Sequence, residues 1–179
     1  MSETDVSFTI LLRDQIRQGL TVAQQYLAAA VYFDSRRLPR LGAHCYARSS
    51  EHRGDALRMI QYLLDRDVEV RVGGLNEVRS DFDSPRAAVA YLLEVERAGI
   101  AQITNLARSA RETSDYLGEG FVQWFLKEQL ENVADMTRLL SVIDRADDAL
   151  FDVEDFIARE SPSVRHDSTA PKMAGAAGK

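Results

Sequence analysis

Three polar residues occupy positions where a buried apolar side chain is expected, and together they could bind a metal ion. His52, Glu96 and Gln129 each interrupt a run of apolar residues spaced at three and four. Because the middles of antiparallel helices meet in a bundle, we expect these side chains to converge. Imidazole and carboxylate groups between helices suit iron, manganese or zinc. The alternative is a satisfied hydrogen-bond network, in which His52 bonds to Glu96 and Gln129 completes the set, since an unpaired buried polar group costs about 1–3 kcal/mol.

Helices must position these residues, and the sequence predicts an all-α protein. Long stretches without Gly or Pro and 28% charged residues favour that class. Apolar residues recur at helical spacing over about 8–34, 38–66, 84–111 and 115–144, and a short fifth helix is expected over about 147–159. Residues 67–83 are expected to form an extended crossover, because one short strand would have no partner. Two hairpins joined by a long crossover between the second and third helices is the topology of a ferritin-like four-helix bundle.

The length and composition predict one domain with a tail. At 179 residues the chain can bury a core. We assign residues 1–160 to the helical domain and residues 161–179, rich in Ser, Pro, Ala and Gly, to a flexible C-terminal tail. The charged residues away from the positions discussed here are expected on solvated faces.

The compartment and the classes of partner are also constrained. The single Cys45 excludes an intramolecular disulfide and a cysteine zinc cluster, which favours a cytoplasmic location. The start lacks the order of a secretion signal and no apolar run reaches about 18 residues, so no membrane partner is expected. The net charge of −6 argues against nucleic acid as a partner.

Several stretches resemble the prokaryotic non-haem ferritins, and most closely their actinobacterial branch. They are QQYLAAAVYFD (24–34), LLDRD (63–67) and GEGFVQWFL (118–126), together with Glu128 and Gln129. The similarity covers about residues 8–160. It implies a bundle with a short fifth helix that assembles with copies of itself into a hollow 24-subunit cage storing ferric mineral.

The resemblance also implies a di-iron oxidation centre, and this chain lacks several of its ligands. Gly19 falls where a first-helix glutamate binds iron. His52 and Asp55 fall where a Glu-x-x-His pair supplies the bridging glutamate and a histidine. Glu96 and Gln129 match the third-helix and fourth-helix residues of the family.

Further positions follow from the same resemblance. Tyr26 matches a tyrosine beside the centre. Glu51, Glu128 and Glu131 match ligands of an accessory third iron site, and Asn132 stands where some members have a further carboxylate.

We therefore expect a cage subunit that binds or stores iron, with weak or no ferroxidase activity, alone or co-assembled with an active ferritin paralogue. One alternative is an active ferroxidase with a rearranged centre built from His52, Asp55, Glu96 and Gln129. Another is a scaffold that stores no iron and binds DNA or another protein. Arg53 falls where a methionine binds haem in bacterioferritins, so no haem is expected.

Overall fold

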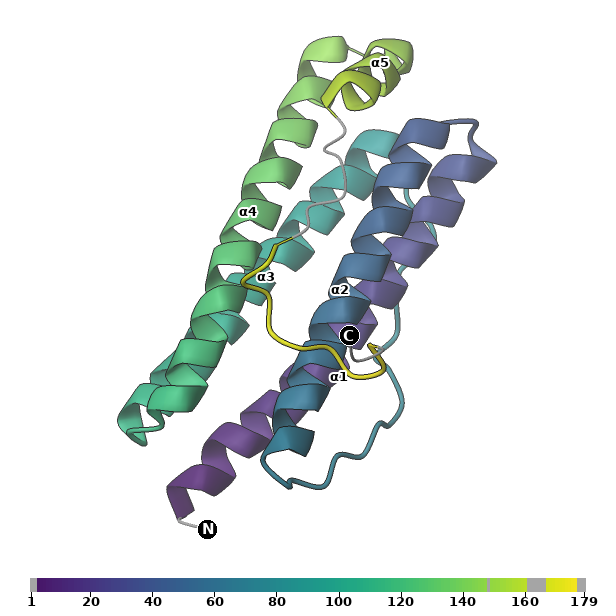
Figure 1. The fold of residues 1–179 in the computed structure, drawn as a ribbon. Coiled ribbons are helices and arrows are strands. Elements are labelled where there is room, and N and C mark those ends of the chain that lie inside the picture. Colours follow the sequence, from purple (N-terminus) through teal and green to yellow (C-terminus); the bar gives the residue numbers. More distant parts are fainter. Residues whose placement is uncertain (1–2, 148, 161–166, 177–179) are drawn as a thin grey trace.

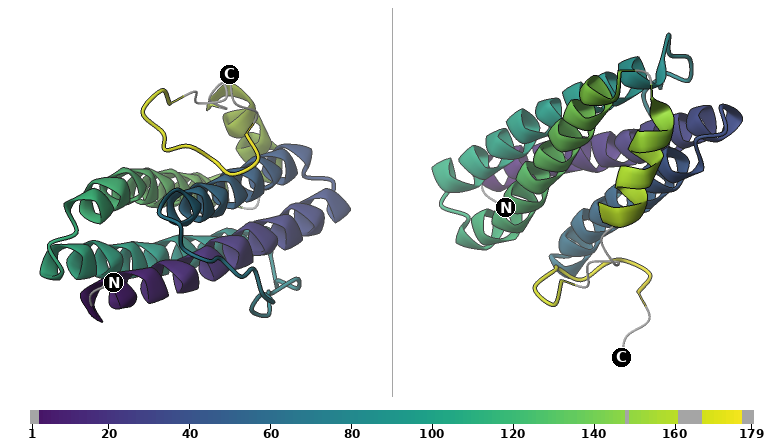
Figure 2. Two further views of the ribbon diagram at one scale, coloured as in Figure 1. Left: turned by 60° about the horizontal axis from the view of Figure 1, so that its bottom comes forward. Right: turned by 90° about the horizontal axis from the view of Figure 1, so that it is seen from above.

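The chain folds into a bundle of long helices closed at one end by a short one. The computed structural model describes residues 3–147, 149–160 and 167–176. These residues form five helices: α1 (Glu3–Ser35), α2 (Pro39–Asp65), α3 (Pro85–Glu112), α4 (Tyr116–Ala146) and α5 (Leu150–Glu160). Helix α1 packs against α2 and α3, and α3 packs against α4 (Figures 1 and 2). The predicted all-α bundle with a short fifth helix is confirmed.

The segment between α2 and α3 is the predicted extended crossover. Within the described residues it contains no strand, and it runs along the outside of the bundle (Figure 1). The side-chain amide of Gln25 on α1 fixes it: Nε2 donates to the backbone oxygen of Arg79 at 2.7 Å, and Oε1 accepts from the Arg79 backbone N–H at 2.8 Å. Ser84 then ends the crossover and caps α3, because its hydroxyl oxygen accepts from the Ala87 N–H at 3.1 Å.

The core has two apolar clusters with a polar layer between them. One cluster contains Phe33, Leu92 and Met136. The other contains Leu12 and Val122 with their neighbours. The buried polar residues outside these clusters are Gln25, Arg48, His52, Glu96, Ser109 and Asn132. Most of them lie near the middle of the long helices, so the candidate site is enclosed by apolar packing on both sides.

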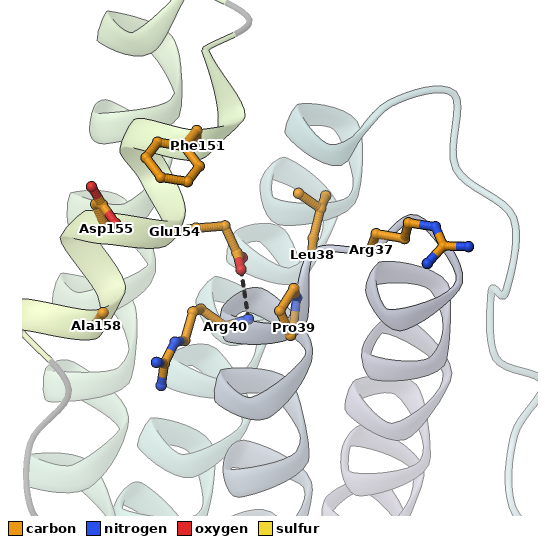
Figure 3. A pocket seen from close by; sticks show the side chains of 8 residues that line it. All are labelled: Arg37, Leu38, Pro39, Arg40, Phe151, Glu154, Asp155 and Ala158. Atoms are coloured by element: carbon orange, nitrogen blue, oxygen red, sulfur yellow. Dashed lines mark hydrogen bonds between the residues drawn. The ribbon is translucent and has the colours of Figure 1, made fainter.

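Helix α5 is held at the end of the bundle by a cap that it provides for α2. Leu38 precedes α2 without a side-chain capping bond, and Pro39 has no N–H to satisfy. Glu154 of α5 fills the gap: its carboxylate accepts the backbone N–H of Arg40 at 2.8 Å (Figure 3). It also accepts the backbone N–H of Leu41 at 2.9 Å. A carboxylate at a helix N-terminus also interacts favourably with the helix dipole. Helix α5 therefore packs at one end of the bundle.

Part of the predicted tail lies against the bundle. The helical domain was predicted to end at residue 160, where α5 ends, and residues 161–166 and 177–179 lie outside the described residues. Residues 167–176 run beside α2 and α4 (Figure 1). Three hydrogen bonds fix this stretch: Trp124 Nε1 to Asp167 Oδ2, Arg58 Nη1 to the Pro171 oxygen, and the Ala174 N–H to the Leu57 oxygen. The flexibility of the tail stays a prediction.

None of the helices in the described part of the chain combines the length and apolar character that crossing a bilayer requires.

Candidate metal centre

The centre of the bundle is a hydrogen-bond network around one carboxylate. Glu96 on α3 is 1% exposed. Its Oε1 accepts the Tyr26 hydroxyl of α1 at 2.6 Å and lies 2.9 Å from His52 Nε2 of α2. Its Oε2 accepts Gln129 Nε2 of α4 at 2.6 Å. The predicted convergence of His52, Glu96 and Gln129 is therefore observed, and each of the four long helices supplies one member.

The local sequence explains why these polar groups face inward. The buried residues of α2 follow helical spacing: Leu41, Cys45, Arg48, His52, Ala56, Met59 and Leu63. His52 belongs to that stripe, so its ring is carried into the core with its apolar neighbours. The His52 ring stacks on the Tyr26 ring with the centroids 5.3 Å apart. This stacking fixes the imidazole plane and aims Nε2 at Glu96.

The network behaves electrostatically as a buried ion pair. Burial disfavours the Glu96 carboxylate, but the positive charge of His52 and the hydrogen bonds from His52 and Tyr26 outweigh it and lower the pKa of Glu96 to about 2. Burial also disfavours the imidazolium, but attraction to Glu96 outweighs it and raises the pKa of His52. A metal ion requires the lone pair of a neutral imidazole, so a protonated His52 must lose its extra proton before it can bind one.

Gly19 lies on α1 opposite Ala56 and His52 of α2. A Cβ atom at Gly19 would lie 3.4 Å from Ala56 Cβ and 3.8 Å from the backbone oxygen of His52. These are ordinary van der Waals distances, so neighbouring atoms of α2 lie against the position. Gly19 has no side chain that could bind a metal ion.

Asp55 lies one turn after His52 but takes part in a different contact. Its side chain is 23% exposed, and Oδ1 lies 3.8 Å from Arg58 Nε. Burial raises the pKa of Asp55 to about 7, although the positive charges of His52 and Arg58 oppose the shift. Its carboxyl group is therefore protonated in the folded protein over much of the acidic range.

We expect the Asp55→Asn variant to be more stable than the parent at pH 8 and equally stable at pH 4. An acid whose folded pKa is raised stabilises the fold below its ordinary value of 3.8 and loses that contribution as pH rises to about 7. The asparagine side chain does not ionise, so the free energy of unfolding of the variant does not fall in this way. Thermal unfolding midpoints of both proteins between pH 4 and pH 8 measure it. Asp65→Asn, at an exposed position of the same helix, is the control, and a pH-independent difference for Asp55→Asn would contradict the assignment.

Two of the residues matched to the accessory iron site contact Arg48. Glu51 Oε2 accepts from Arg48 Nη1 at 3.0 Å, and Asn132 Oδ1 accepts from the same nitrogen at 2.6 Å. The negative charges of Glu128 and Glu51 both help to raise the pKa of Asp55. Glu131 is half-buried on α4. Within the described ranges, no three His, Cys, Asp or Glu side chains are grouped so that they could hold a metal ion.

The burial of Arg48 was not predicted from the sequence. As one of the remaining charged residues it was expected on a solvated face, and that expectation is wrong, because its side chain is only 11% exposed. Arg48 lies three residues after Cys45 and four before His52, within the buried stripe of α2. That spacing was the available signal.

Comparison with known proteins agrees with the fold. The sequence model described as "Ferritin-like domain" matches residues 10–146. "Ferritin BfrB" of Mycolicibacterium smegmatis is 50% identical over 173 residues, which cover 97% of this chain and 96% of that protein. "Ferritin BfrB" of Mycobacterium tuberculosis (strain Erdman) is 47% identical over 168 residues, covering 94% and 93%.

Solved structures show the same arrangement of helices. An open pore ferritin from the archaeon Archaeoglobus fulgidus superposes with a TM-score of 0.83 at 24% identity, covering 89% of this chain and 96% of that one. The mycobacterial relatives confirm the predicted likeness to actinobacterial ferritins. The chain belongs to the ferritin family.

Proposed function

We propose that the chain is a subunit of an iron-storing cage and that its own di-iron oxidation centre is impaired. Family membership supports the cage and the iron. The observation that supports the impairment is the network around Glu96, whose two carboxylate oxygens accept hydrogen bonds from Tyr26, His52 and Gln129. The only carboxylate in this network is thereby committed to protein partners.

The chemistry of iron oxidation explains why this matters. Reduction of O₂ by two electrons takes one electron from each of two ferrous ions, so the ions must be held side by side. Bundles that do this use a carboxylate from each of two helices and a Glu-x-x-His motif from each of the other two. Here Gly19 offers no carboxylate, and His52 and Asp55 stand in place of a Glu-x-x-His pair. At most one ion position keeps its ligands, Glu96 and Gln129.

The proposal extends to the assembled cage and its partners. The subunit assembles with copies of itself into a cage of 24 subunits in the cytoplasm, and an active ferritin paralogue can enter the same cage. Haem is not part of the proposal, because the exposed Arg53 cannot ligate iron where the family places a haem methionine. The iron that the cage stores is its cargo, bound weakly by Glu96, Gln129, Glu128, Glu131 and Glu51, with His52 and Asp55.

We expect the purified protein to form a large shell and to oxidise iron slowly. Size-exclusion chromatography with light scattering measures the shell. Stopped-flow absorbance after addition of about two ferrous ions per subunit in air measures the oxidation. A trace no faster than buffer alone, with slow mineral growth on further loading, is the expected result. A fast phase that Glu96→Ala abolishes would establish the rearranged active centre instead, and a shell that takes up no iron would point to a scaffold.

A further inference from the structure

A buried arginine occupies the space between α2 and α4 next to the Glu96 network. Arg48 Nη1 donates to Glu51 Oε2 at 3.0 Å and to Asn132 Oδ1 at 2.6 Å. Arg48 Nη2 donates to Asp135 Oδ2 at 2.7 Å. Three side-chain oxygens from two helices therefore surround one guanidinium group.

These oxygens are the ligands that a hard divalent cation prefers. Two are carboxylate oxygens and one is an amide oxygen, the donor types that bind Mg²⁺, Mn²⁺ and ferrous iron. Asn132 is buried and the Asp135 side chain is 21% exposed, so their charge and dipole need a positive partner. In this chain that partner is the guanidinium group of Arg48.

The surroundings keep the guanidinium charged. Burial works against the charged form, but the negative charges of Glu51, Asp135 and Glu96 outweigh it and raise the pKa of Arg48. The neighbouring His44 responds in the opposite direction: burial and the positive charge of Arg48 lower its pKa to about 4. Its buried Nε2 has no hydrogen-bond partner among the described residues. A second cation placed here would meet a fixed positive charge.

We infer that Arg48 serves as a tethered cation, which fills the position between Glu51, Asn132 and Asp135 and thereby excludes a divalent metal ion from it. The inference deepens the proposed function and rests on it in one respect, because Glu51 and Asn132 are positions of the family's accessory iron site. It adds a reason for slow iron chemistry that is independent of Gly19 and His52. The positive charge of Arg48 keeps metal ions out of the accessory position. This effect is separate from the altered ligands of the oxidation centre.

Zinc-soaked crystals of the assembled full-length protein test this, with Zn²⁺ located by anomalous diffraction. In the parent we expect no Zn²⁺ between Glu51 and Asp135. In Arg48→Ala we expect one additional Zn²⁺ per subunit, bound to both carboxylates. In Arg48→Ala combined with Asp135→Asn that ion should disappear. If Arg48 served only to join α2 and α4, Arg48→Ala would have a lower thermal midpoint than the parent and would bind no additional Zn²⁺.

Arg138→Ala is the matched control. Arg138 Nη2 also lies near Asp135, 3.6 Å from Oδ1, but its side chain is 58% exposed. Its removal takes a positive charge from the same carboxylate without opening the buried position, so no Zn²⁺ should appear. Zn²⁺ bound in the parent with Arg48 displaced, or an empty position in Arg48→Ala, would overturn the inference.

The test stands even where the alanine variant does not fold. Arg48→Gln keeps most of the side-chain length and removes the charge, and the soak of the parent is informative by itself. Shell formation and iron uptake are measured separately on the parent. Failure of those measurements rejects the proposed function, whereas failure of the zinc pattern rejects only the role of Arg48.

Discussion

The variant that carries Gly19→Glu, His52→Glu and Asp55→His together should oxidise ferrous iron at least about tenfold faster than the parent, which corresponds to a barrier lower by about 1.4 kcal/mol. The change supplies a carboxylate from α1 and a Glu-x-x-His pair on α2, while Glu96 stays in place. It also removes the imidazole that now bonds to Glu96. Two ferrous ions can then be held side by side. Stopped-flow absorbance at low iron loading measures the rate.

The structure leaves room for a Cβ atom at Gly19. The Cβ atom added at Gly19 would lie 3.4 Å from Ala56 Cβ, an ordinary van der Waals distance. The control carries Gly19→Gln, His52→Gln and Asp55→Asn, which supply neither a new carboxylate nor a new imidazole. If both triple variants oxidised iron at the same rate, the defect would lie outside these three residues, and Arg48 would be the next position to change.

The second large effect concerns stability: Glu96→Ala should destabilise the subunit by about 3 kcal/mol or more. Removing Glu96 takes away the partner of the buried His52 Nε2, which lies 2.9 Å from Glu96 Oε1. The Tyr26 hydroxyl and the Gln129 amide lose their acceptor as well. Guanidinium unfolding at a fixed subunit concentration measures the loss, because the stability of an assembled protein depends on concentration.

Glu94 provides the comparison from the same helix. Its side chain is 67% exposed and pairs with Arg97 at 2.6 Å. Exposed pairs of this kind contribute about 0–1 kcal/mol, so Glu94→Ala should cost less than about 1 kcal/mol. Equal destabilisation by the two substitutions would mean that the Glu96 network adds nothing beyond a surface pair.

The helices and the central network could be predicted because each leaves a mark within a single helix. Ser84 followed by Pro85 marks the start of α3, and the Ser84 side chain caps that helix. His52 and Glu96 stand in otherwise apolar stripes, which requires polar partners on neighbouring helices. The spacing of residues along each helix was sufficient to find these positions. Their convergence followed from the antiparallel arrangement of the helices.

The missed features depend on residues that only the fold brings together. From the sequence, Arg48 is expected to be solvated, because its partners Asn132 and Asp135 lie on α4 and are far from it along the chain. The docked stretch 167–176 has a composition typical of a disordered chain, and its position depends on hydrogen bonds to Arg58 and other residues of α2 and α4. Long-range pairings of this kind leave no periodicity in the sequence.

The cap that α5 provides for α2 has a consequence for the order in which the protein is made. Leu41 and Glu154 are separated by 113 residues. At about 5–20 residues per second, the ribosome adds the capping carboxylate roughly 6 to 23 seconds after the amides that it satisfies. During that interval the first hairpin exists with an incomplete helix start. Completion of the α2 start therefore has to wait until α5 has been synthesised.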